Sequence, residues 1–180
     1  MVAGERERLL QLAKTEPDAS LRGDAVHQLG VMNARSELSE LYQTEASTEV
    51  KKKILHAMFI GGDSDRLIEL AKSERDPELR RSAIQSLGLM KRQGTADALV
   101  SIYNGDQSPE IRKAVINALF IQNSASTLVG LARAEKNPDM HAEVRVNAGE
   151  NEAGDEWRRQ EFEHRCIHVA STWWPRRRSS

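Results

Sequence analysis

The densest set of potential metal ligands in this sequence lies near its C-terminus. His164 and His168 are four residues apart, and Cys166 lies between them. On a helix the two imidazoles would share a face, but the thiol would not join them. No fourth ligand accompanies this set, so the pattern favours chance composition over a metal site.

Other patterns that carry chemistry are weak along the whole chain. No paired carboxylates, Ser-His-Asp order or glycine-rich phosphate loop stands out. The pairs Gly61-Gly62 and Asn104-Gly105 are typical of turns between helices. We therefore expect a protein that is not an enzyme and that has no catalytic residues, metal or cofactor.

Basic and hydrogen-bonding side chains recur at a regular spacing. A first column comprises Arg22, Lys51, Arg80 and Arg112, and a second comprises Gly23, Lys52, Arg81 and Lys113. A third comprises His27, His56, Gln85 and Asn117. Such rows of donors suit an acidic peptide or a phosphate backbone. The candidate partner-binding residues are Arg22, His27, Lys52, His56, Arg81, Gln85, Lys113 and Asn117.

A structural interpretation of the same columns competes with the functional one and is favoured over it. Glu49, Glu78 and Glu110 run beside the basic residues, so much of the charge can be neutralised within and between repeats. Cations in the first turn of a helix also oppose its dipole and call for acids nearby. The basic run at residues 51–53 is explained more simply by a solvated helix face.

The elements that would position these columns are internal repeats. The segment LLQLAKTE at residues 9–16 recurs as LIELAKSE at 67–74 and as LVGLARAE at 128–135, with spacings of 58 and 61 residues. Related starts at Leu38 and Leu99 halve this period. The elementary unit therefore has 29 to 32 residues.

Each unit is predicted to form a helical hairpin. A short helix with an apolar stripe is followed by a polar break, and a second helix opens with proline after an aspartate cap, as at Asp76-Pro77. The second helix carries apolar residues three and four positions apart. These slots hold Leu21, Ala25 and Leu29; Val50, Ile54 and Met58; Leu79, Ala83 and Leu87; and Ile111, Val115 and Leu119. One hairpin cannot bury its apolar face alone, whereas stacked hairpins can.

The segment DPELRRSAIQSLG at residues 76–88 resembles the short bacterial HEAT-like repeat, and SPEIR at 108–112 and NPDM at 137–140 are weaker copies. The resemblance covers about residues 5–140 and implies an all-α solenoid of stacked antiparallel hairpins in a right-handed superhelix. In such solenoids the second helices usually line the concave surface. We expect four hairpins and the first helix of a fifth.

The pattern changes after Met140. The last leucine is Leu131, and all three tryptophans lie beyond it. We interpret residues 141–180 as an atypical tail, disordered or irregularly helical, that is either out of frame or fused; a divergent cap or a mobile tail is the alternative. The ending Trp173-Trp174 with Arg176 to Arg178 could suggest stacking on nucleic acid or membrane contact, but in a segment without a period it is more simply incidental.

The resemblance implies a non-catalytic protein–protein interaction scaffold, part of a larger bacterial HEAT-repeat protein. The alternative is a HEAT-like enzyme or accessory, similar to a bilin lyase subunit or an alkylpurine DNA glycosylase. Residues 1–140 hold 19 Lys and Arg against 20 Asp and Glu, which disfavours a nucleic-acid partner. The sequence shows neither a secretory signal nor a run of 18 apolar residues. The expected compartment is therefore the cytoplasm, or the periplasm if an upstream segment is missing.

Overall fold

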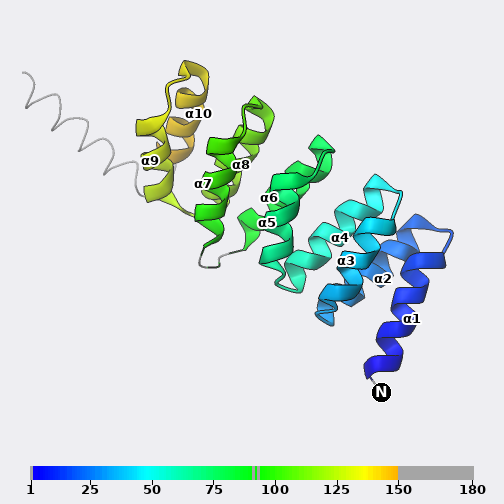
Figure 1. The fold of residues 1–180 in the computed structure, drawn as a ribbon. Coiled ribbons are helices and arrows are strands. Elements are labelled where there is room, and N and C mark those ends of the chain that lie inside the picture. Colours follow the sequence, from blue (N-terminus) through cyan, green and yellow to red (C-terminus); the bar gives the residue numbers. More distant parts are fainter. Residues whose placement is uncertain (1, 91, 93, 150–180) are drawn as a thin grey trace, which may run out of the picture. The chain divides into compact units, whose positions relative to one another are not determined.

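A computed structural model describes residues 2–90, 92 and 94–149, and these residues form ten α-helices and no strand (Figure 1). The helices are α1 (Val2–Thr15), α2 (Ala19–Val31), α3 (Arg35–Thr44), α4 (Thr48–Ile60), α5 (Ser64–Ser73), α6 (Pro77–Leu89), α7 (Thr95–Gly105), α8 (Pro109–Ile121), α9 (Ala125–Ala134) and α10 (Pro138–Gly149). The chain divides into unit 1, Met1–Ser124, and unit 2, Ala125–Ser180.

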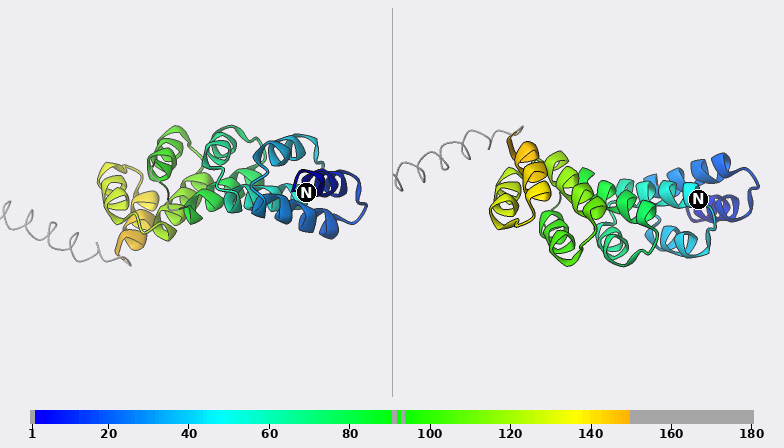
Figure 2. Two further views of the ribbon diagram at one scale, coloured as in Figure 1. Left: turned by 90° about the horizontal axis from the view of Figure 1, so that it is seen from below. Right: turned by 90° about the horizontal axis from the view of Figure 1, so that it is seen from above.

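Unit 1 consists of four helical hairpins, α1–α2, α3–α4, α5–α6 and α7–α8, which follow one another in chain order. The second helices touch in the sequence α2, α4, α6, α8, and the first helices lie along one side of this row (Figure 2). The predicted all-α stack of hairpins is therefore confirmed. The handedness of a superhelix and the concavity of one face stay predictions.

The core of unit 1 lies between the two helix rows and is made by the predicted slots. Leu38, Leu67 and Leu99 of the first helices are fully buried. In the second helices Val50, Ile54 and Met58, together with their counterparts in α6 and α8, are at most 3% exposed. Leu21 differs, because it is 52% exposed. Its side chain lines an open hollow with Leu9 and Leu12.

Side-chain caps begin the second helices α2, α4 and α6, whereas the Ser108 side chain makes no cap hydrogen bond at the start of α8. Asp18 accepts a hydrogen bond from the backbone N–H of Ser20, and Asp76 accepts from those of Glu78 and Leu79. Proline occupies the first turn of α6 and of α8. Each cap satisfies backbone donors that have no partner inside the helix.

The turns between hairpins use left-handed backbone. Asn33, Gly62 and Asn123 have φ values of 56°, 66° and 58°, a region open to glycine and tolerated by asparagine. The predicted turn at Gly61-Gly62 is thus confirmed. The predicted turn at Asn104-Gly105 is wrong, because both residues belong to the last turn of α7 and the chain leaves the helix only at Asp106.

Glycine at the end of the repeat motif brings second helices into close contact. A Cβ added at Gly30 would lie 2.7 Å from the carbonyl oxygen of Ala57, and one at Gly88 would lie 2.8 Å from the Cα of Ala118. These are backbone atoms, so a side chain could be accommodated only by moving the helices apart. Gly30 and Gly88 therefore fix the spacing of α2 to α4 and of α6 to α8.

Unit 2 contains the fifth hairpin, in which α9 packs against α10. The expectation that the repeats end near residue 140, without a second helix, differs from the structure here. Met140 and Val144 of α10 are buried, at 2% and 0% exposure. Two apolar anchors and the Asn137 side chain, which accepts from the N–H of Met140 at 3.4 Å, accompany a helix that runs to Gly149. The predicted tail beyond it, with His164, Cys166, His168, Trp173 and Trp174, lies outside the described residues.

The close approach of α2 and α4 predicts that Gly30→Ala destabilises the chain by about 1–3 kcal/mol, since overpacking outweighs the higher helix propensity of alanine. Urea unfolding of the full chain followed by circular dichroism measures this change. Gly105→Ala is the control, because no atom lies within 4 Å of a Cβ added there. Equal effects of the two substitutions would contradict the close-packing argument.

Candidate functional site

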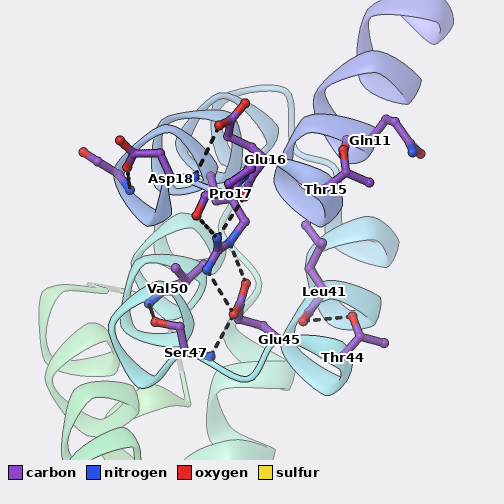
Figure 3. Close-up of polar contacts among 12 residues, drawn as sticks. Gln11, Thr15, Glu16, Pro17, Asp18, Leu41, Thr44, Glu45, Ser47 and Val50 are labelled. Atoms are coloured by element: carbon purple, nitrogen blue, oxygen red, sulfur yellow. Dashed lines mark hydrogen bonds and ion pairs between the residues drawn. The ribbon is translucent and has the colours of Figure 1, made fainter.

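Two cations of the first column, Arg22 and Arg80, hold consecutive hairpins together. The Nε of Arg22 lies 3.2 Å from a carboxylate oxygen of Glu45, and its Nη1 donates to the carbonyl oxygens of Glu16 and Pro17 at 2.9 and 3.1 Å. The two charged side chains are only 16% and 11% exposed. Figure 3 shows Glu45 between the two hairpin turns, with dashed lines to its partners. Arg22, a candidate partner-binding residue, is therefore engaged in an inter-hairpin bridge.

Arg80 repeats this arrangement in the third hairpin. Its Nη1 lies 2.5 Å from a carboxylate oxygen of Asp106, and its Nε donates to the carbonyl oxygen of Ala71 at 2.8 Å. The structural interpretation of the first column is thus the one that these contacts support.

In the second and fourth hairpins, the cation of the first column packs over a tyrosine ring of its own hairpin. The ammonium of Lys51 lies 5.1 Å from the ring centre of Tyr42, and the guanidinium of Arg112 lies 4.2 Å from that of Tyr103. Cations over aromatic faces are held by the ring quadrupole. The hydroxyl of Tyr42 donates to Glu74 at 2.6 Å, so it joins the second hairpin to the third.

An acidic residue follows the first helix of every hairpin, and we call these residues the turn acids: Glu16, Glu45, Glu74, Asp106 and Glu135. Each accepts a hydrogen bond from the backbone N–H two residues further on, at distances between 2.7 and 3.3 Å. In unit 1, Glu45, Glu74 and Asp106 also accept a donor from the preceding hairpin. Sequence reasoning missed this role, although an acid ends each of the three aligned segments LLQLAKTE, LIELAKSE and LVGLARAE.

Electrostatics at the turn acid of the third hairpin follow from its partners. Burial alone would raise the pKa of Glu74. The hydrogen bonds from the Tyr42 hydroxyl and from the N–H groups of Asp76 and Arg75, with the nearby Lys51 charge, instead hold this pKa below its usual value. Burial raises the pKa of Tyr42, and the hydrogen bond to Glu74 raises it further. Glu74 is therefore held as a carboxylate and Tyr42 as a neutral donor.

The second and third columns lie on the exposed side of the second helices. The exposed members are His27, His56, Arg81, Gln85, Lys113 and Asn117, and Lys52 is half-buried. His27, Lys52 and His56 meet in a hollow of about 360 Å³, whose other lining residues are Gly23, Asp24 and Lys53. Lys52 also lies 2.9 Å from Glu78 of the next hairpin, in an exposed ion pair of the kind that contributes little to stability.

A further column on this side was missed by sequence reasoning. Val31, Leu89 and Ile121 are 60%, 47% and 46% exposed, and Ile60 at the equivalent position is half-buried. We call these four residues the aliphatic stripe. Each follows a member of the third column by four residues, so that spacing could have revealed it.

The described part of the chain contains no group of three or more His, Cys, Asp or Glu side chains that could hold a metal ion. Among the same residues, no helix is both long and apolar enough to cross a membrane.

Stacked hairpins joined by turn acids define an α-helical repeat protein. Residues 64–150 match the family model of HEAT repeats, and over this part the chain is similar to that family. The slots and turn acids of residues 9–60 continue the same pattern upstream. No curated protein gives a significant match to this chain.

The depressed pKa of Glu74 predicts an acid-dependent loss of stability. A carboxyl whose pKa is lower in the folded state stabilises the fold above its unfolded pKa, and that contribution disappears as the pH falls through the folded pKa. Wild type should therefore exceed Glu74→Gln by about 1 kcal/mol in urea unfolding at pH 6, and this gap should shrink toward pH 3. In the Tyr42→Phe background, the difference between Glu74 and Glu74→Gln should be smaller, because one hydrogen bond to the carboxylate is already lost. A difference that does not change with pH would contradict this assignment.

Proposed function

We propose that this chain is a non-catalytic scaffold that binds a protein partner on the exposed side of the second helices of unit 1. The proposal rests on one observed difference: the first column is engaged in contacts within the fold, whereas most residues of the other two columns are exposed. Arg22, Arg80 and Lys51 are occupied in contacts within and between hairpins. The second column stands one residue after the first on each helix and the third column four residues further on, and apart from Gly23 and the half-buried Lys52 their members are exposed.

The chemistry of these exposed columns favours an acidic peptide segment. Arg81 is exposed, and within the described residues its side chain forms no ion pair or hydrogen bond. The imidazoles of His27 and His56 and the amides of Gln85 and Asn117 can both donate and accept hydrogen bonds. Exposed ion pairs such as Lys52–Glu78 are weak, so an incoming carboxylate can take the place of Glu78 at little cost.

A defined probe tests this proposal. Fluorescein-labelled dodecapeptides of alternating Glu and Gly, or alternating Gln and Gly, are titrated with the full chain and followed by anisotropy at low salt. The acidic peptide should bind more tightly. The double substitution Lys52→Glu with Arg81→Glu should weaken its binding about tenfold, because it reverses two charges on the second column.

The matched control reverses two exposed charges near the first-helix row, Lys72→Glu with Arg75→Glu, and should leave binding unchanged. Equal loss in both double variants would reduce the effect to net charge and overturn the proposed surface. A labelled DNA duplex serves as competitor. DNA retention that survives moderate salt would replace the peptide by a nucleic-acid partner.

A further inference from the structure

The aliphatic stripe is a surface feature that the fold itself does not require. Its members lie at the last residues of α2, α4, α6 and α8, where Val31, Leu89 and Ile121 keep about half of their surface in water. The positions four residues earlier hold polar side chains in all four helices. Single exposed aliphatic residues are ordinary, but a repeated row on adjacent helices marks an interaction surface.

The contacts between second helices bring the stripe into line. Gly30 faces Ala57, and Gly88 faces Ala118. A strict repeat register would place Gly30 opposite residue 59 and Gly88 opposite residue 120. The observed partners are two residues earlier in each case, a shift of about 3 Å along a helix. Val31 therefore lies near the level of Ile60, and Leu89 near that of Ile121. The stripe thus crosses the second-helix row at their C-terminal ends.

The spacing of the stripe selects the conformation of its occupant. Packed helices are about 8–10 Å apart, so the stripe offers one apolar contact at that interval. An α-helix laid across the row presents side chains of one face every seven residues, about 10.5 Å apart. In an extended chain, same-face side chains recur at about 7 or 13 Å. Three intervals span about 24–30 Å, which corresponds to about 16–20 residues of helix.

The charges beside the stripe select the polarity of that helix. The second column, with Lys52, Arg81 and Lys113, lies two turns from the stripe on the same helices. The hydrogen-bonding third column lies between them. A helix whose apolar side covers the stripe therefore places one flank over cations, and acidic residues suit that flank.

We infer that the aliphatic stripe binds an amphipathic helix of a partner protein, with aliphatic residues at heptad spacing and acidic residues along one flank. This inference rests on the proposed function and specifies the partner that it leaves open. The apolar stripe supplies the larger part of the affinity, and the cations set the orientation.

The probe is a fluorescein-labelled, end-capped 21-residue peptide with leucine at the a and d positions of three heptads, glutamate on one flank and alanine or glutamine elsewhere. It should bind the full chain, and a scrambled peptide of equal composition should bind about tenfold more weakly. Replacing glutamate by lysine should also weaken binding at low salt, because the lysines would face the cations of the second column. Scrambled and lysine peptides that bind as tightly as the probe would overturn the inference.

The test variant is Leu89→Ser with Ile121→Ser, which should weaken binding of the probe about tenfold. The control is Leu12→Ser, because Leu12 is 49% exposed but belongs to the first helix α1. Circular dichroism melting checks that all variants stay folded. Equal binding of test variant, control and wild type would overturn the stripe as the site.

The outcomes separate the two proposals. If Lys52→Glu with Arg81→Glu weakens the acidic dodecapeptide while Leu89→Ser with Ile121→Ser leaves the helical probe unaffected, the scaffold surface stands and the inferred helix fails. If neither double variant changes the binding of its peptide, both proposals fail.

Discussion

The structure of unit 1 depends on one interaction, the capture of a donor from one hairpin by the turn acid of the next. A helical hairpin of about 30 residues has too little buried surface to fold alone, so its stability has to come from its neighbours. Apolar stacking supplies the energy but is tolerant of sliding. The turn acid accepts a backbone N–H of its own turn and a side chain from the preceding hairpin, and it thereby fixes the register between them.

This constraint is met in two alternating ways. Odd hairpins reach forward with arginine, Arg22 to Glu45 and Arg80 to Asp106. The second hairpin reaches forward with the Tyr42 hydroxyl to Glu74, and its cation packs over the same ring. Glycine at positions 30 and 88 alternates with phenylalanine at 59 and 120. The structural repeat of the chain is therefore a pair of hairpins. This explains why the sequence is more similar to itself at spacings of 58 and 61 residues than at half those spacings.

One side of each second helix therefore packs against neighbouring helices, and another side stays exposed. Residues of the first column are engaged, and those of the second and third columns are exposed apart from Gly23 and the half-buried Lys52. The aliphatic stripe shares this exposed side. Because the hairpins are held in register, the stripe residues of successive helices combine into a surface larger than one hairpin could offer.

Much of the fold could be predicted from the sequence because it rests on local periodicity. Leu38, Ile54 and Leu87 lie in the buried slots that their spacing predicts. The second helix of the fifth hairpin was missed because only Met140 and Val144 mark it, and the leucine slot of the pattern has no leucine.

The candidate site was harder to predict, because spacing places side chains on a helix face without saying what they contact. Arg22 and His27 were equivalent candidates in the sequence. The first is bridged to Glu45, and the second lines an open hollow. That distinction depends on the turn of the next hairpin, 23 residues away, and no local pattern contains it.

The central claim, that turn acids couple successive hairpins, is tested most directly by a double-mutant cycle on Arg22 and Glu45. The control is the cycle on Lys14 and Glu40, which joins the same two hairpins at a shorter distance, 2.7 Å, but with side chains 33% and 56% exposed. Urea unfolding should give a coupling energy of about 1–2 kcal/mol for Arg22 with Glu45 and less than about 0.5 kcal/mol for Lys14 with Glu40. A coupling for Arg22 with Glu45 no larger than that of the exposed pair would contradict the account.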